Sequence, residues 1–337
     1  MAKQVRIGLI GAGRIGKLHA RNISFNIADA TIAAVSDVYL DSARACAAEC
    51  GIPKAVGDHQ EIMSDPDIDA IFICSSTDTH SQMIIEGAES GKHIFCEKPI
   101  DHDLSRIDQA LDAVEKAGVK LQIGFNRRFD PNFKRAQESV AAGDLGTPHV
   151  IRITSRDPEP PPIEYVKISG GIFLDMMIHD FDMCRFLMGE EVTEVYAVGT
   201  TLIDPKIGEA GDVDTAVVTL TYESGAYCVI DNSRQAVYGY DQRIEVFGSE
   251  GCVVVGNPAP NSATFFQRGR IQRDPIPYFF LERYNEAYLE ETREFITCVQ
   301  EDTMPSVTGI DGRIPILMGM AAQQSLEEHR PVKVSSR

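Results

Sequence analysis

Short apolar runs rich in β-branched residues alternate with longer amphipathic stretches over the first 125 residues. Such runs predict strands buried on both faces, and the stretches between them predict helices. The predicted strands are Val5–Ile10, Thr31–Val35, Ile68–Cys74, His93–Cys96 and Val119–Phe125, and the predicted helices span 14–26, 41–50, 80–90 and 103–117. Strands that alternate with helices indicate a parallel sheet covered on both faces, so residues 1–125 predict a doubly wound α/β domain.

The pattern changes after residue 125, where runs of alternating apolar and polar residues appear. Period-two runs separated by glycine-containing turns predict an antiparallel sheet. The predicted strands are Pro148–Ser155, Val192–Leu202, Asp214–Tyr222, Ala226–Ser233, Arg243–Phe247, Cys252–Val255 and Ala263–Gln267, and helices are predicted at 131–142, 171–188, 284–301 and 311–330. We therefore expect a second α/β domain, mainly antiparallel, over residues 126–337.

The composition excludes several classes of protein. Of the 337 residues, 43% are hydrophobic and 24% charged, which argues against a largely disordered chain. The net charge of −18 argues against nucleic-acid binding, and no apolar stretch approaches the roughly 20 residues that span a bilayer. The chain runs from Met1 into the first predicted strand without an apolar signal segment, so we expect no signal peptide, and the eight cysteines show no zinc-like spacing. We expect reduced thiols in a cytoplasmic protein, and no metal site.

The segment Gly11-Ala12-Gly13-Arg14-Ile15-Gly16 follows the first predicted strand and opens the first predicted helix. In this order Gly11 permits a tight turn, Gly13 lets the backbone approach a pyrophosphate, and Gly16 allows close helix–strand packing. An anion is favoured at the helix start by free N–H groups and the helix dipole. We therefore expect Gly11, Gly13, Arg14, Ile15 and Gly16 to bind a dinucleotide, in a domain of the Rossmann type.

Asp37 ends the second predicted strand, 21 residues beyond Gly16. A carboxylate at this position accepts hydrogen bonds from the adenosine ribose and repels a 2′-phosphate. The Val38-Tyr39 that follows offers no arginine to hold such a phosphate. The sequence therefore predicts NAD rather than NADP.

Lys98 stands in Glu97-Lys98-Pro99, directly after the predicted strand that begins at His93. Ligands bind beyond the carboxyl ends of parallel strands, so we expect Glu97 and Lys98 to lie at the ligand crevice. A lysine beside a hydroxyl that is being oxidised can stabilise the developing alkoxide or relay a proton. The alternative is a solvated lysine in a turn.

Asp175, His179 and Asp182 fall at i, i+4 and i+7 of the predicted helix 171–188. One stripe of a continuous helix would carry all three, and most residues between them are apolar. Ionisable groups on a largely buried helix are costly unless they line a site, so His179 is a candidate general base and Asp175 a candidate substrate ligand. The alternatives are a self-satisfied His–Asp pair or half of a metal site, for which no second cluster is apparent.

Other polar loops follow predicted strands. Ser75, Ser76, Thr77 and His80 form a loop expected to contact the nicotinamide half of the cofactor, to cap the next helix, or both. Of the arginines in Asn126-Arg127-Arg128, one is expected to form an internal ion pair and the other to face the site. The further substrate-binding candidates are Asn126, Arg128, Asp157 and Tyr240.

These motifs together resemble the Gfo/Idh/MocA oxidoreductase family, whose hallmarks are a dinucleotide fold, a Glu-Lys-Pro such as Glu97–Pro99, and an Asp-x-x-x-His such as Asp175…His179. The resemblance covers essentially the whole chain, and within the family it is greatest to bacterial members that oxidise inositols. The segments that carry it are Gly124–Pro131, Ser155–Pro158, Ser169–Asp182 and Tyr238–Arg243. One departure is Ser76, where many relatives have proline.

The resemblance implies that Lys98, Asp175 and His179 surround the reacting carbon, and that the second domain has a large open-faced sheet used to build dimers and tetramers. The implied reaction is NAD-dependent oxidation of a ring secondary alcohol, with myo-inositol converted to its 2-keto form. His179 would take up the hydroxyl proton while Lys98 hydrogen-bonds the reacting oxygen. The alternatives are another inositol isomer, a cyclic sugar, a non-catalytic NAD-sensing regulator, or an enzyme that keeps its nicotinamide bound throughout the reaction.

Overall fold

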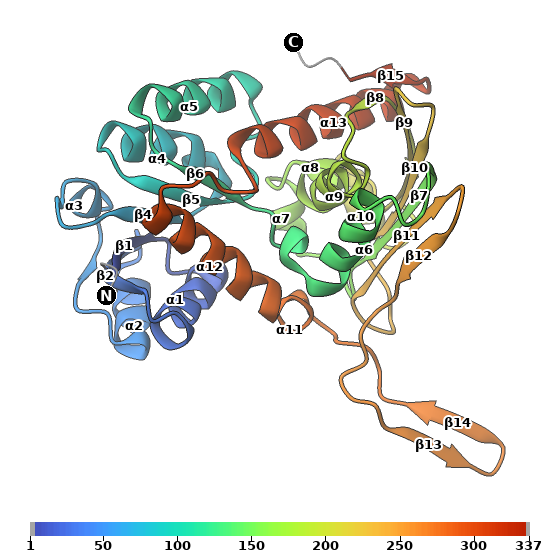
Figure 1. Cartoon of the computed structure of the whole chain (residues 1–337), viewed down its shortest axis with the longest axis horizontal. Coiled ribbons are helices and arrows are strands. Elements are labelled where there is room, and N and C mark those ends of the chain that lie inside the picture. Colours follow the sequence, from blue (N-terminus) through green and yellow to red (C-terminus); the bar gives the residue numbers. More distant parts are fainter. Residues whose placement is uncertain (1–3, 335–337) are drawn as a thin grey trace. The chain divides into compact units, whose positions relative to one another are not determined.

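The computed structural model describes residues 4–334, and these divide into two units (Figure 1). Unit one comprises residues 4–129 and 286–313, and unit two comprises residues 130–285 and 314–334. The boundary expected at residue 125 lies within unit one. The main difference from the expected division is the segment 286–313, which the sequence placed in the second domain and which packs in the first.

Unit one is built on a six-stranded sheet in which every neighbouring pair is parallel. Its strands are β1 (Val5–Ile10), β2 (Ala30–Ser36), β3 (Ala55–Val56), β4 (Ala70–Ile73), β5 (His93–Glu97) and β6 (Leu121–Gly124), in the order β3-β2-β1-β4-β5-β6. The order reverses between β1 and β4, which is where Rossmann folds bind dinucleotides. The doubly wound prediction is confirmed, although the two-residue β3 was not foreseen.

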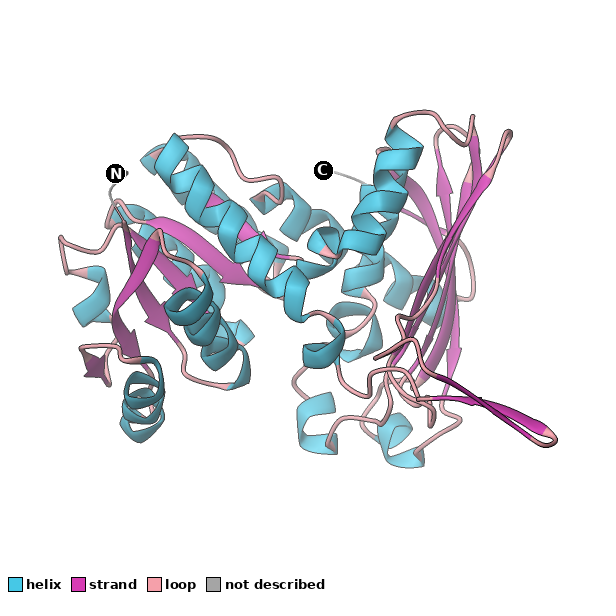
Figure 2. Ribbon diagram, turned by 60° about the horizontal axis from the view of Figure 1, so that its bottom comes forward, coloured by secondary structure: helices cyan, strands magenta, loops and turns pink. Residues whose placement is uncertain are grey.

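Helices cover both faces of this sheet (Figures 1 and 2). They are α1 (Arg14–Asn26), α2 (Leu40–Cys50), α3 (Gln60–Met63), α4 (Thr77–Glu89), α5 (Leu104–Ala117), the 3-10 turn η1 (Asn126–Phe129), α12 (Asn285–Glu301) and the start of α13 (Gly309–Glu328). Phe72 and Phe95 stack with ring centroids 4.6 Å apart, and Phe295 of α12 packs edge-on against both. Because Phe295 and Ile296 are buried in this core, α12 belongs to unit one.

Unit two is built on a seven-stranded sheet in the order β12-β11-β7-β10-β9-β8-β15. Neighbouring strands in this sheet are antiparallel, except for β7 and β10, which pair in parallel at its centre. The strands are β7 (Pro148–Arg156), β8 (Val192–Thr200), β9 (Thr215–Tyr222), β10 (Tyr227–Ser233), β11 (Asp241–Gly248), β12 (Cys252–Val255) and β15 (Val332–Lys333). The prediction of a mainly antiparallel sheet is confirmed.

The helices of unit two lie on one side of this sheet, and its other face is open (Figure 2). They are α6 (Pro131–Ala141), α7 (Ile163–Val166), α8 (Gly171–Asp175), α9 (Ile178–Met188), α10 (Pro205–Glu209), α11 (Phe280–Arg283) and the rest of α13. Large apolar side chains on the strands remain exposed, among them Tyr196, Val198, Val217, Tyr227 and Phe247.

Two predictions of secondary structure were wrong. The run Ala263–Gln267 does not join the large sheet. Its residues Thr264–Gln267 form β13, which pairs only with β14 (Arg270–Arg273) in a separate hairpin closed by Arg268 and Gly269, the latter at φ +82°. The predicted helix 171–188 is broken after Asp175, because the N–H of Met177 donates to the carbonyl of Ile172 five residues back, at 2.8 Å. This wider turn interrupts the regular ladder between α8 and α9.

All eight cysteines lie within the described residues, and all are free thiols. Seven are buried and Cys252 is exposed. Burial raises the pKa of the Cys46 thiol to about 11. Among residues 4–334, none of the helices combines the length and the hydropathy that crossing a membrane requires.

Candidate active site

The glycine turn between β1 and α1 has the geometry that its sequence predicted. Gly11 adopts φ +97°, and a Cβ on it would lie 2.4 Å from the carbonyl oxygen of Cys74. A Cβ on Gly16 would lie 1.9 Å from the carbonyl oxygen of Gly11, so helix and turn are in direct contact. Above Gly13, by contrast, no atom lies within 4 Å of the corresponding position. The turn is therefore closed beneath and open at Gly13, where a ligand can approach the backbone.

The first turn of α1 carries no acidic residue, and its cap residue, Gly13, provides no side chain. The first N–H groups of this helix, which starts with Arg14 and Ile15, are the donors that a pyrophosphate accepts from. These residues fit a dinucleotide phosphate, and NAD is the cofactor that the adjoining Asp37 favours.

Asp37 holds the glycine turn in place. Its Oδ2 accepts a hydrogen bond from the N–H of Ala12 at 2.8 Å, and its Oδ1 accepts one from the N–H of Tyr39 at 2.8 Å. Each carboxylate oxygen has a second lone pair, so Asp37 can also accept from a ribose hydroxyl. The neighbouring Val38 and Tyr39 are exposed, and neither offers a positive charge to a phosphate.

The loop after β4 is tied to the loop after β5 through His80. This buried ring has Nδ1 2.8 Å from the carbonyl oxygen of Pro99 and Nε2 3.1 Å from that of Ser75. Burial lowers the pKa of His80 below its ordinary 6.5, while the two carbonyl contacts oppose that shift. His80 therefore lies behind the loops, where it sets their spacing.

The residues between Ser75 and His80 start a helix earlier than expected. Helix α4 begins at Thr77, and Ser76 occupies the cap position without a side-chain capping bond. The Ser75 hydroxyl lies 2.7 Å from that of Thr79, and the Thr79 hydroxyl donates to the carbonyl of Ser76 at 2.7 Å. The Ser76 side chain therefore does not cap α4, and helix capping does not explain why this residue is polar.

Lys98 directly follows β5, is half-buried, and is joined to Pro99 by a cis peptide bond. Glu97, its neighbour, is the last residue of β5 and pairs with Gly124 of β6. The Glu97 carboxyl packs over Gly124, where a Cβ would lie 3.1 Å from its carboxyl carbon. The Glu97 side chain is therefore buried inside unit one, whereas the half-buried Lys98 follows it just beyond the carboxyl end of β5.

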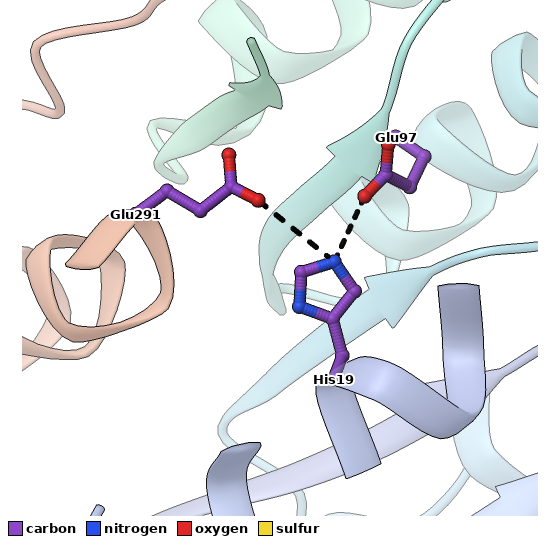
Figure 3. Close-up of side chains that lie close together, drawn as sticks. All are labelled: His19, Glu97 and Glu291. Atoms are coloured by element: carbon purple, nitrogen blue, oxygen red, sulfur yellow. Dashed lines mark hydrogen bonds and ion pairs between the residues drawn. The ribbon is translucent and has the colours of Figure 1, made fainter. Parts of the chain in front are cut away.

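Glu97 belongs to a buried cluster with His19 of α1 and Glu291 of α12 (Figure 3). His19 Nε2 lies 2.8 Å from Glu97 Oε1 and 4.0 Å from Glu291 Oε1. Neither carboxyl oxygen of Glu291 has a hydrogen-bond partner. Burial, and then the neighbouring Glu97 and Glu294, hold the pKa of Glu291 well above its ordinary value. The protonated, neutral form of Glu291 is therefore favoured within the core.

Arg128 forms an ion pair with Asp311, with Nη2 2.9 Å from Oδ1. Asp311 in turn accepts from the N–H and the hydroxyl of Thr308, so Arg128 secures the start of α13 within unit one. Asn126 is buried beside it in η1, and its Nδ2 has no hydrogen-bond partner. Substrate binding by Asn126 and Arg128 stays a prediction.

In unit two, Asp175 is the last residue of α8 and is held by two other elements. Its Oδ1 accepts from the Tyr165 hydroxyl at 2.8 Å, and its Oδ2 lies 3.4 Å from Nη1 of Arg234. The fully buried Arg234 also pairs with Asp212 at 3.2 Å, and Asp212 accepts from the N–H of Ile172 at the start of α8. The Asp175 carboxylate is thus held by the positive charge of Arg234 at Oδ2 and by the Tyr165 hydroxyl at Oδ1.

His179 is the second residue of α9 and is half-buried. Since α8 ends at Asp175, the prediction that Asp175, His179 and Asp182 share one stripe of a continuous helix was wrong. The residues between them are nevertheless buried as expected, and so is Asp182.

Asp157 and Tyr240 lie beside strands of the large sheet. The backbone of Asp157 bonds to Ser233 and Ala236, which places it just beyond β7 and β10. Tyr240 is buried edge-on against Tyr284, with ring centroids 6.0 Å apart. Roles for these two residues in substrate binding stay predictions.

Comparison with known proteins gives a full-length match. Residues 5–125 match the oxidoreductase family with an NAD-binding Rossmann fold, and residues 133–254 match the GFO/IDH/MocA C-terminal domain. The chain belongs to the GFO/IDH/MocA oxidoreductase family. The resemblance seen in its motifs is therefore confirmed.

Relatives in the GFO/IDH/MocA family align with the chain almost end to end. It is 52% identical to myo-inositol 2-dehydrogenase of Thermotoga maritima, over 98% of both chains. It is 46% identical to inositol 2-dehydrogenase of Rhizobium meliloti, over 98% of this chain and 99% of the relative. A crystal structure of scyllo-inositol dehydrogenase from Lactobacillus casei with bound NAD(H) and scyllo-inositol has 32% identity and a TM-score of 0.93, over 99% and 100% of the two chains.

Several residues that contact the candidate side chains within each unit were not foreseen from the sequence of this family member. They are His19, Glu291 and Thr292 in unit one, and Tyr165, Asp212 and Arg234 in unit two. His19 alone carried a recognisable pattern, because it lies on the buried stripe of α1 with Gly16, Ala20 and Ile23. The others carry no such pattern, because their contacts with His19, Asp175 and Arg234 span 10 to 273 residues.

Proposed function

We propose that the protein is an NAD-dependent inositol 2-dehydrogenase that oxidises myo-inositol to its 2-keto form. The observation that carries the proposal is the 52% identity to a myo-inositol 2-dehydrogenase over 98% of both chains. The open glycine turn and Asp37 support it, because together they fit the pyrophosphate and the adenosine ribose of NAD. When bound, NAD supplies a nicotinamide ring that accepts a hydride.

The chain's own residues then handle the hydroxyl group. His179 takes up the hydroxyl proton as general base, and Lys98 donates a hydrogen bond to the reacting oxygen as negative charge develops there. Asp175, held by Tyr165 and Arg234, accepts hydrogen bonds from the substrate. Ser75, Ser76, Thr77 and His80 form or support the loop proposed to contact the cofactor, and Asn126, Arg128, Asp157 and Tyr240 are the proposed further substrate ligands.

The experiment is a panel of cyclic polyols and sugars assayed with NAD and with NADP, following the absorbance of reduced nicotinamide. We expect turnover with myo-inositol and NAD. Lys98→Met and His179→Gln should each lower kcat by about 10²–10⁴-fold, the usual range for loss of a general acid or base. The exposed Lys167→Met serves as the matched control. Binding of NADH without turnover of any polyol would favour an NAD-sensing regulator instead.

A second candidate substrate is scyllo-inositol. The observation that favours it is the fold similarity to a scyllo-inositol dehydrogenase crystallised with that ligand, at a TM-score of 0.93. Myo- and scyllo-inositol differ in the orientation of one hydroxyl, which a site distinguishes by the hydrogen bonds that are left unpaired. The ratio of kcat/KM for the two isomers decides between them.

We also infer that the protein is a homo-oligomer, a dimer or a tetramer, assembled through the open face of the large sheet. Exposed Tyr196, Val198, Val217, Tyr227 and Phe247 on the strands support this, because apolar patches of this kind mark protein interfaces. Light scattering during size-exclusion chromatography measures the mass, and Tyr227→Lys should reduce it. The eight free thiols, seven of them buried, support a location in the reducing cytoplasm.

A further inference from the structure

His19 connects three elements of unit one. It lies on α1, and its ring is fully buried among Phe72, Phe95 and Tyr288, with ring centroids 5.0 to 6.0 Å apart. Its Nε2 reaches Glu97 on β5 at 2.8 Å, and its Nδ1 reaches the Thr292 hydroxyl on α12 at 3.2 Å. Because aromatic rings surround the imidazole, its orientation is fixed.

The hydrogen-bond partners of His19 define where its protons are. The Thr292 hydroxyl donates its only hydrogen to the carbonyl of Tyr288 at 2.8 Å, which leaves its oxygen to accept from Nδ1 of His19. With Nδ1 as a donor, the 2.8 Å contact between Nε2 and Glu97 must contain a further proton, since two bare lone pairs would repel. The pair therefore shares one proton and is neutral as a unit.

The shared proton between His19 and Glu97 explains why these side chains lie so close to Glu291 without a bound metal ion. The ligand atoms of His19, Glu97 and Glu291 lie within 4.8 Å of one another, which would also suit a metal ion. However, the contact between His19 and Glu97 has the length of a hydrogen bond, and all three residues are buried. A metal site also needs an entry path, and the enclosed ring of His19 offers none.

His19 and Glu97 lie on elements that also carry the proposed cofactor-binding and catalytic residues. Helix α1 begins at Arg14 in the glycine turn, five residues before His19, and β5 ends at Glu97, next to Lys98. The hydrogen bond between His19 and Glu97 thus joins the helix that fits the pyrophosphate to the strand end that carries the lysine. A displacement of about 1 Å between reacting groups is enough to cost about 10²-fold in rate.

We propose that His19 and Glu97 are positioning residues for hydride transfer, which set the distance between the bound dinucleotide and Lys98. This inference rests on the proposed function. Loss of the contact would leave the dinucleotide bound but misplace Lys98, so kcat should fall while the affinity for the cofactor is kept.

The test uses two substitutions that disturb the contact in different ways. Gly124→Ala pushes on the Glu97 carboxyl, because its new Cβ would lie 3.1 Å from the carboxyl carbon and Oε2 and 3.3 Å from Oε1. His19→Gln keeps an N–H donor near the place of Nε2 but cannot also donate to Thr292. Gly57→Ala is the matched control, since no atom lies within 4 Å of its new Cβ.

Five quantities are measured on the full-length proteins: kcat and KM for myo-inositol, the NADH dissociation constant by NADH fluorescence, the melting temperature, and the isotope effect with myo-inositol deuterated at the oxidised carbon. We expect Gly124→Ala to lower kcat about 10- to 100-fold and to raise the isotope effect, with NADH affinity within about threefold of the wild type. His19→Gln should lose less of kcat, and Gly57→Ala none.

Three results would overturn the proposal. If kcat is unchanged in folded Gly124→Ala and His19→Gln, the contact does not position Lys98. If the drop in rate follows the loss of NADH affinity or of folded protein, the role is structural only. If EDTA abolishes activity and zinc restores it, the cluster is a metal site. A wild-type protein that binds NADH but oxidises no polyol would instead refute the proposed function, and the inference with it.

Discussion

The Oδ2 atom of Asp37 accepts a hydrogen bond from the backbone N–H of Ala12 at 2.8 Å, so the residue expected to recognise the ribose also shapes the glycine turn. Asp37→Asn keeps an acceptor for the Ala12 N–H and removes the negative charge. We expect the preference for NAD over NADP, measured as the ratio of kcat/KM values, to fall by about tenfold, equivalent to ~1.4 kcal/mol. An unchanged ratio would show that another residue excludes the 2′-phosphate. Asp41→Asn is the control, on an exposed carboxyl that follows shortly after.

The two glycines of the turn should respond to alanine in opposite ways. In Gly16→Ala the Cβ meets the carbonyl oxygen of Gly11 at 1.9 Å, and backbone cannot yield as a side chain does. We expect a loss of stability of about 1–3 kcal/mol in urea unfolding, as for overpacked cores. Gly13→Ala meets no atom within 4 Å, so its stability should match the wild type while its affinity for NADH falls. If Gly16→Ala and Gly13→Ala change the free energy of unfolding and the NADH affinity to the same extent, the two glycines do not have these separate roles.

Glu291 should make stability depend on pH. Its pKa is higher in the folded chain than the ordinary 4.5, because it is buried and faces Glu97 and Glu294, with His19 Nε2 4.0 Å away. Folding above pH 4.5 must therefore bind a proton at Glu291, and the stability that this group contributes is lost as the pH rises. Glu291→Gln removes that cost, so its advantage over the wild type should grow as the pH rises above 4.5, by up to about 1.4 kcal/mol per pH unit.

The measurement for this pH effect is the free energy of unfolding in urea at several pH values. Glu290→Gln is the matched control, because Glu290 is partly exposed and pairs with Arg293 on the surface of α12. A difference between Glu291→Gln and the wild type that stays constant with pH would mean that Glu291 ionises freely in the folded state.

The Tyr165 hydroxyl donates to Asp175 at 2.8 Å, and Tyr165→Phe removes only this bond. We expect KM for myo-inositol to rise a few-fold, consistent with about 1 kcal/mol for one hydrogen bond, with the NADH dissociation constant unchanged. Tyr196→Phe, on the exposed face of the sheet, controls for loss of a hydroxyl. A change in NADH affinity instead of KM would assign Tyr165 to the cofactor rather than the substrate.

Local patterns predicted much of this fold. The bounds of β1 and α1 match those expected from apolar periodicity, and the glycine turn between them has the predicted geometry, because contacts within a few residues determine it. The break between α8 and α9 was missed, since Ile172 and Met177 carry no helix-breaking residue between them. The separate hairpin β13–β14 was missed because period two predicts a strand but not its partner.

The candidate site was predicted only where a motif marks it. Asp37 and Lys98 follow strands at the edge where ligands bind, so their positions could be inferred from topology. The contact of His19 with Glu97 spans 78 residues and that with Thr292 spans 273, and no local pattern encodes such distances. Arg234 was missed for the same reason, because its partners Asp175, at the end of α8, and Asp212 lie 59 and 22 residues away in the sequence.

Residues 286–313 belong to unit one although they follow most of unit two in the sequence, and this affects the order in which the two units can fold during synthesis. Phe295 completes the aromatic core with Phe72 and Phe95, and Thr292 supplies the partner for His19 Nδ1. A ribosome therefore synthesises all of 130–285 before the core of unit one can close, and until then α1 and β5 lack the helix that buries them. The cofactor-binding half, although first to be synthesised, is among the last to finish folding.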